Sequence, residues 1–271
     1  MRALTSLNGV EISLLCVGGA LAFALATGFI LRQLVHVGAR ESAGLTAAAY
    51  MTVLGSLFAI LTGFLINTEY STYRQAQNGV GTEVAAASEL AYASASLPAV
   101  DASLVQDRLR SYLVTASVRE WPHLAHDAEA PSPASANVSQ LSQLVYSFGP
   151  RPYVGSSTSD AMNAAMTSLT EARRQRIVIA TQELPLPLFL LAVISGVALI
   201  VGSLLVALRS GPRYAFVAAG IILIVGFDLA AILSISAPFA GPTVVSVTAA
   251  PIEQVVSELR AGLYLPWISS P

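Results

Sequence analysis

A single acidic residue inside a long apolar segment is the position in this sequence with the clearest potential for chemistry. Asp228 lies 14 residues after Tyr214, where the segment starts, which is about 21 Å along a helix. An ionised carboxylate that deep in a membrane costs at least about 2.5 kcal/mol, and acids found there are usually functional. Two interpretations stay open: a pore-lining or proton-coupled residue, and a neutral carboxyl satisfied within helix packing. The hydroxyl groups that could bond to it belong to Thr52, Ser56, Ser195 and Ser203.

Small and polar side chains recur along the second apolar segment. Because their spacing is three or four residues, they fall on one narrow face of a helix. Such a stripe could line an aqueous conduit. The commoner role of small residues is close contact between membrane helices. The stripe consists of Thr52, Ser56, Ala59, Gly63 and Asn67.

Three arginines stand just before the third apolar segment, at Arg173, Arg174 and Arg176. Such a cluster could draw inorganic anions or contact anionic lipid headgroups. A solvated group of charges flanking the membrane is the alternative.

Catalytic and metal-binding patterns are weak. His123, His126 and Asp127 could hold a metal on one helical turn, but they follow Trp121-Pro122 and precede a Pro/Ser-rich stretch, which favours an ordinary loop. The sequence contains no phosphate-binding glycine loop, no HExxH and no GxSxG. We therefore expect no metal, no cofactor and no enzymatic activity.

The elements that must position these residues are set by hydropathy. Residues 12–31, 42–68 and 184–208 carry no charge, and a fourth apolar run starts at Tyr214. Each is long enough to cross a bilayer as a helix, which takes about 20 residues. With 54% apolar and only 11% charged residues, the chain is predicted to be an integral membrane protein. Its net charge of −2 gives no reason to expect nucleic acid as a partner.

The predicted fold class is an all-α membrane protein, with four transmembrane helices in two hairpins and a long helical extramembrane insert between spans 2 and 3. Within the insert, we expect the helix of span 2 to continue to Leu97-Pro98, and further helices over 101–119 and 138–147 around a loop at 121–136. Ser157 and Asp160 are spaced to cap a last helix running towards Glu183. The predicted divisions are hairpin 1 over 1–67 (spans 12–32 and 45–67), the insert over 68–183, hairpin 2 over 184–236 (spans 185–208 and 214–236), and a C-terminal segment over 237–271 with an amphipathic helix near 251–262.

Several strings, in this order and spacing, resemble the bacterial bestrophin-like membrane proteins, distant relatives of the bestrophin anion channels. The resemblance covers most of residues 45–260. The strings are Phe64-Leu65-Ile66-Asn67, Tyr73-Arg74 and Glu83-Val84-Ala85 after span 2, Arg119-Glu120-Trp121-Pro122, Ala172-Arg173 with Arg176 before Pro185, and Pro238-Phe239-Ala240-Gly241 followed by Ser246 and Pro251.

The resemblance implies a homo-oligomer, with a pentamer as one option, whose axial pore is lined by span 2 and conducts anions or other ions. It also implies that the insert lies on the cytoplasmic side of the cell membrane. Arginine counts, four in the short links against five on the insert side, do not decide the orientation. One departure from the family is that Ser236-Ala237 replace an acidic residue that is common there. Animal bestrophins bind calcium with a cluster of acidic residues, but only the scattered Glu253 and Glu258 follow span 4 here, so calcium gating is not expected.

The stripe and the resemblance together predict an ion-conducting oligomer. The alternative from another class is a non-conducting membrane scaffold or sensor that recruits partners through its helical insert. A third hypothesis is a proton-coupled carrier centred on Asp228.

Overall fold

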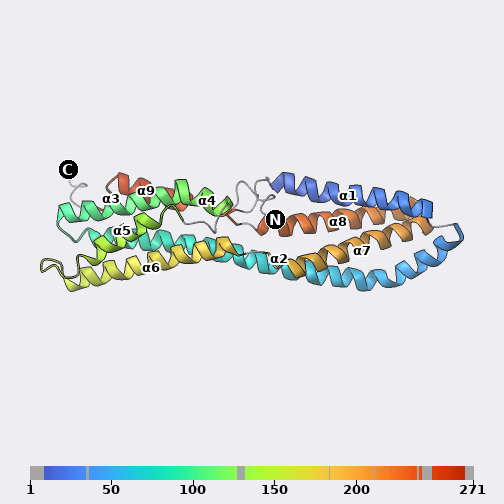
Figure 1. Cartoon of the computed structure of the whole chain (residues 1–271), viewed down its shortest axis with the longest axis horizontal. Helices are drawn as coiled ribbons and strands as arrows, with labels where there is room; N and C mark the ends of the chain where they lie inside the picture. Colours follow the sequence, from blue (N-terminus) through green and yellow to red (C-terminus); the bar gives the residue numbers. More distant parts are fainter. Residues whose placement is uncertain are drawn as a thin grey trace.

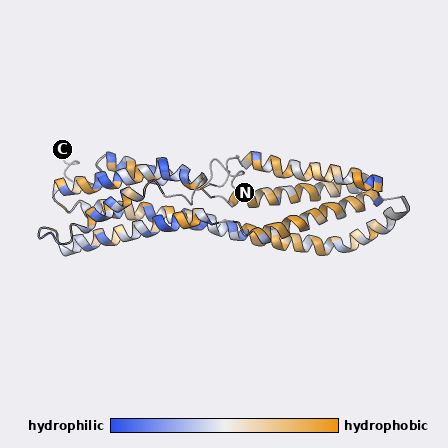
Figure 2. Cartoon of the chain, viewed as in Figure 1, coloured by the Kyte–Doolittle hydropathy of each residue, from blue (hydrophilic) through white to orange (hydrophobic). Residues whose placement is uncertain are grey.

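The computed structural model describes residues 9–34, 37–126, 132–182, 184–210, 212–236, 238–239 and 246–265. All regular elements in these ranges are helical, which confirms the predicted all-α fold class. Figure 1 shows an elongated molecule in which the helices form two bundles end to end. Figure 2 shows that one bundle is almost wholly apolar, whereas hydrophilic residues are frequent in the other.

The apolar bundle contains the four predicted spans. All four helices are long and apolar enough to cross a membrane. Helix α1 packs against α8, and α7 packs against both α2 and α8. Large apolar side chains such as Leu25 and Phe216 are exposed on its outside, as expected of a surface that meets lipid. The helices are α1 (Gly9–Leu34), the first part of α2 (Val37–Ser94), α7 (Leu186–Ser210) and α8 (Pro212–Ile235).

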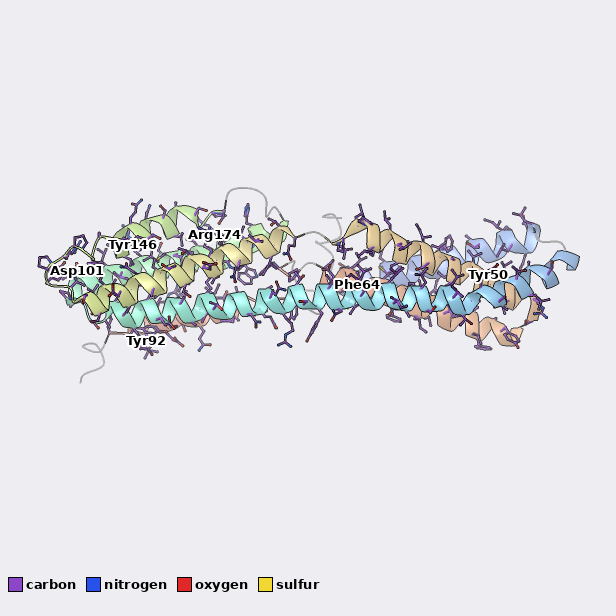
Figure 3. All side chains as sticks on the ribbon, turned by 90° about the horizontal axis from the view of Figure 1, so that it is seen from below. Tyr50, Phe64, Tyr92, Asp101, Tyr146 and Arg174 are labelled. Atoms are coloured by element: carbon purple, nitrogen blue, oxygen red, sulfur yellow. The ribbon has the colours of Figure 1, made fainter. Side chains whose placement is uncertain are left out.

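Helix α2 joins the two bundles without a break (Figures 1 and 3). The sequence predicted that this helix continues beyond the membrane, and its 58 residues confirm that. It ends at Ser94, three residues before the predicted stop at Leu97, and Pro98 becomes the N-cap of the next helix. One rigid element therefore carries side chains from the membrane bundle into the insert.

The insert packs around the far half of α2. Helix α6 lies along α2, and the C-terminal helix α9 contacts α2 and α3. The predicted amphipathic face of α9 is confirmed, since Ile252, Val255, Val256 and Leu259 are all buried. The elements are α3 (Ala99–Thr115), the π-helix η2 (Ala116–Glu120), α4 (Trp121–His126), α5 (Ser135–Tyr146), α6 (Ser156–Thr181) and α9 (Ala250–Arg260).

A left-handed glycine ends α9. Gly262 has φ of 68°, and Leu263 N–H donates to the carbonyl of Glu258 at 3.2 Å. This bond closes the helix end in the manner of a Schellman motif, in which glycine is the preferred residue. The turn returns the chain to α2, where Tyr264 and Leu265 are buried.

Two local predictions were wrong. Residues 121–126 are helical rather than part of a loop, because the chain leaves α3 through a π-turn and starts α4 with Pro122 in its first turn. Proline lacks an N–H and suits that position, whereas it would break an uninterrupted α-helix. The predicted cap at Ser157 is also absent: α6 begins at Ser156, with Gly155 at the N-cap and no side-chain cap hydrogen bond.

Candidate functional site

One face of α2 is left uncovered by the other described residues of the chain. Its other face packs into the cores of both bundles. Thr52, Ser56, Ala59, Gly63 and Asn67, the predicted stripe, are all exposed. Taking about 100° per residue, their side chains fall within an arc of about 80°, roughly opposite the buried positions. Those buried positions are Phe58, Leu65, Ala76, Glu83 and Leu90.

Within the described ranges, the stripe does not pack against another helix. A Cβ atom built on Gly63 would meet no atom within 4 Å. By contrast, a Cβ on Gly226 of α8 would lie 2.9 Å from Val17 Cα, and one on Gly196 of α7 would lie 2.9 Å from Val225. Close helix contacts within the subunit are thus made at Gly196 and Gly226, whereas the stripe that contains Gly63 faces outward.

Asp228 lies on α8 and is partly buried. Among the described residues, no hydrogen bond or ion pair involves its carboxylate. The hydroxyls of Ser56, Ser195 and Ser203 each donate instead to a carbonyl three residues earlier in their own helix. The two interpretations of Asp228 therefore stay open.

The three arginines take different positions. Arg174 is exposed on α6, and Figure 3 shows it labelled on that helix. Arg173 and Arg176 are buried, with 9% and 0% of their surface exposed, and both contact carboxylates inside the insert. Because both guanidinium groups are buried and paired, neither is open to a free anion or a lipid headgroup in this structure.

Arg176 is the centre of a buried ion-pair network. Its Nε donates to Glu83 Oε2 at 2.8 Å, and its Nη2 donates to Glu83 Oε1 at 3.0 Å and to Glu120 Oε1 at 2.7 Å. Burial alone would lower the pKa of Arg176. The negative charges beside it, that of Glu83 first, and its hydrogen bonds to Glu83 together more than offset burial, so the pKa is raised and the guanidinium stays charged. These bonds tie α2 to η2 and α6.

Arg173 extends the network to the start of α5. Its Nη2 donates to Glu120 Oε2 at 2.8 Å, to Ser132 Oγ at 2.7 Å and to Ser135 Oγ at 3.2 Å. Burial would raise the pKa of Glu120, but the positive charges of Arg176 and Arg173 outweigh that effect and lower it. The stability contributed by this carboxylate is therefore present above its ordinary pKa of 4.5 and is lost as the pH falls through the lowered value.

Aromatic residues enclose the network. The Tyr112 hydroxyl donates to Glu83, and burial followed by the charge of Glu83 raises the pKa of that phenol, which keeps it a donor. The guanidinium carbon of Arg176 lies 5.3 Å from the centroid of the Trp121 ring, and Trp121 packs edge-on against Phe239. The network thus connects α2 to the segment that follows α8.

Sequence reasoning gave no role to Glu83, Glu120 or Tyr112 in this network. One signal was available for Glu83, which lies on the same helical face as the buried Val80 and Ala87. A carboxylate on an apolar face requires a partner, because an unpaired buried charge is very costly. The partner could not be named, because it lies 93 residues away in the chain.

No metal centre is found in the described part of the chain, where no three His, Cys, Asp or Glu side chains form a group. His123 lies on α4. Asp127 and the side chain of His126 lie outside the described residues, so the His-x-x-His-Asp string stays untested.

Comparison with known proteins now decides the family. The model of the Bestrophin-like domain matches residues 18–250, which is most of the chain. This chain belongs to the bestrophin-like family. Among curated proteins, no sequence matches it.

Solved structures share the fold. A single-substitution variant of a bacterial bestrophin homologue from Klebsiella pneumoniae matches with a TM-score of 0.69 and 15% identity, covering 93% of this chain and 97% of that one. A second structure of the Klebsiella pneumoniae homologue, phased on zinc, matches with a TM-score of 0.69 and 13% identity, covering 94% of this chain and 98% of that one. The predicted resemblance is confirmed. Membership supports a membrane channel rather than an enzyme, at the level of the family.

Proposed function

We propose that the protein is a homo-oligomeric ion channel in which α2 of each subunit lines a central pore and inorganic anions are the permeant species. A pentamer is one option for the assembly. The observation that carries the proposal is the uncovered face of α2, which continues from the membrane bundle into the insert.

The chemistry of that face supports a wet surface. Thr52, Ser56 and Asn67 offer hydroxyl and amide groups, whereas the outer surface of α1 carries large apolar residues such as Leu25 and Phe29. Polar groups are costly in hydrocarbon and favourable beside water. If several copies of the chain surrounded a common axis with α2 of each copy innermost, the polar face of α2 would point towards that axis and away from lipid.

Ile60 and Phe64 lie on one side of the stripe, about 20° and 60° beyond its edge on the helix, and are 69% and 55% exposed. Rings of such side chains around an axis would form an apolar constriction, which can gate ion flow by excluding water. We further propose that the channel lies in the cell membrane with its helical insert in the cytoplasm. That orientation rests on the family resemblance.

Conductance in planar bilayers tests the proposal. Purified wild-type protein is expected to give selective currents, and Gly63→Trp is expected to block them by filling the pore with an indole ring. Because no atom lies within 4 Å of a Cβ at this position, the substitution does not clash inside the subunit.

Gly18→Trp is the matched control. Gly18 is also exposed, also lies within a membrane helix and also has no atom within 4 Å of a built Cβ, but it belongs to α1. Wild-type current with block by Gly63→Trp alone supports the proposal. Silence of the wild-type protein across pH, lipid and voltage would contradict it and favour the scaffold or sensor.

A further inference from the structure

The uncovered face of α2 carries very few charges. In the part of α2 from Ser42 to Ser94, the charged residues are Glu69, Arg74, Glu83 and Glu89. Glu69 and Glu83 lie on the packed side and are 6% and 0% exposed. Only Arg74 and Glu89 of these four are exposed.

Arg74 lies in line with the predicted stripe. It follows Ser56 by 18 residues, which is about five full turns, so the two side chains leave the helix in the same direction. It stands seven residues beyond Asn67, about 10 Å along the axis, where the proposed conduit leaves the membrane. Glu89 is rotated by about 60° from Ser56 and lies about 22 Å farther along the helix than Arg74.

The Arg74 guanidinium has no carboxylate beside it in the part of the subunit that the structure describes. Among the described residues, no ion pair or hydrogen bond involves it. By contrast, Arg173 and Arg176 of α6 are both held by carboxylates. Arg74 thus presents a full positive charge to whatever the α2 face contacts.

The surface beyond Arg74 is polar and mostly uncharged. A shallow groove between α2 and α6 begins one turn later and offers amide and hydroxyl groups. Glu89 is the charged residue among the described residues that line it. The groove is lined by Gln77, Asn78, Gly81, Thr82, Ala85, Ala86, Glu89 and Ser168. An anion that passes the level of Arg74 would therefore meet neutral hydrogen-bond donors before it meets an acid.

We propose that Arg74 is the residue that selects for anions, as a ring of guanidinium groups, one from each subunit, at the insert side of the membrane. This inference rests on the proposed function, because it requires copies of α2 around a common axis. Rings of arginine raise the local concentration of anions and repel cations in a pore.

Reversal potentials in a potassium chloride gradient test the inference, with wild type compared against Arg74→Gln, Arg74→Glu and Arg174→Gln. We expect Arg74→Gln to lower the chloride-to-potassium permeability ratio roughly tenfold, which corresponds to about 1.4 kcal/mol. Arg74→Glu should reverse the sign of the selectivity. Arg174→Gln removes the same charge from an exposed position on α6 and should leave the ratio unchanged.

Ionic strength gives a second readout. Since a charged ring is screened by salt, the ratio in the wild type should rise as the salt concentration falls, and this dependence should disappear in Arg74→Gln. Currents of unaltered selectivity in both Arg74 variants would overturn the inference. An equal shift of the permeability ratio in Arg174→Gln would also overturn it. The same holds if Arg74→Gln changed only how the current depends on the lipid composition, because that result would indicate a contact with lipid headgroups. Absence of current in all four proteins would instead contradict the channel itself.

Discussion

At the scale of single residues, Arg176 is the side chain on which the insert depends most. It is fully buried and satisfies two carboxylates that belong to different helices. A buried ion pair adds little stability compared with a well-packed apolar pair, but removing one partner leaves an uncompensated charge. Here the loss of one guanidinium would leave Glu83 without its ion-pair partner and weaken the hold on Glu120.

We expect Arg176→Met to lower the free energy of unfolding by about 3–5 kcal/mol, the usual cost of breaking a buried pair. Thermal unfolding in detergent, followed by circular dichroism, would measure the loss. Arg174→Met is the control, because an exposed arginine two residues away should change the stability by no more than about 0.5 kcal/mol. Equal unfolding temperatures for both variants would show that the ion-pair network around Arg176 contributes nothing to the stability of the folded protein.

At the scale of elements, α1 approaches α8 very closely at Gly226. A Cβ atom on Gly226 would lie 2.9 Å from Val17 Cα and 3.5 Å from the Cys16 carbonyl oxygen. Backbone atoms cannot rotate away as a flexible side chain can, so the helices would have to separate.

We expect Gly226→Ala to destabilise the membrane bundle by about 1–3 kcal/mol, as overpacking does in well-packed cores. Gly220→Ala, one methyl group added to the same helix, should be neutral or stabilising by up to about 1 kcal/mol, because alanine favours helix and no atom lies within 4 Å of the new Cβ. The unfolding temperatures of the two variants in detergent provide the comparison. If Gly226→Ala unfolded at a higher temperature than Gly220→Ala, there would be room for a methyl group between α1 and α8 at Gly226, which would contradict the close contact.

The elements also show what sequence alone could predict. Four spans, the continuation of α2 and the buried face of α9 follow from hydropathy and helical period, which are properties of neighbouring residues. The helical state of 121–126 was missed because Pro122 and the Pro/Ser-rich stretch after it favour a loop, whereas Pro122 lies in the first turn of α4, where proline is tolerated. The network was missed because Glu83, Glu120 and Arg176 meet only after three helices have docked.

At the scale of the whole molecule, a single chain with a polar face along α2 is incomplete. Ser56 and Asn67 would face hydrocarbon or the membrane surface in a monomer, whereas neighbouring copies would enclose them around water. The channel proposal and the scaffold alternative therefore differ first in the number of subunits and only then in conductance.

Chemical cross-linking separates the two. Cys16 is the only cysteine, so Cys16→Ser gives a background without thiols, into which Ser56→Cys places one thiol on the uncovered face of α2. A short bismaleimide should then link α2 of one subunit to α2 of another and give covalent dimers at low protein concentration. One thiol per chain permits dimers and nothing larger, so any larger species would indicate non-specific reaction. Leu25→Cys in the same background is the control, because this exposed side chain of α1 faces away from the proposed axis and should stay monomeric on denaturing gels. Cross-linking at neither position, or equally at both, would leave α2 without a partner helix and remove the basis for a central pore.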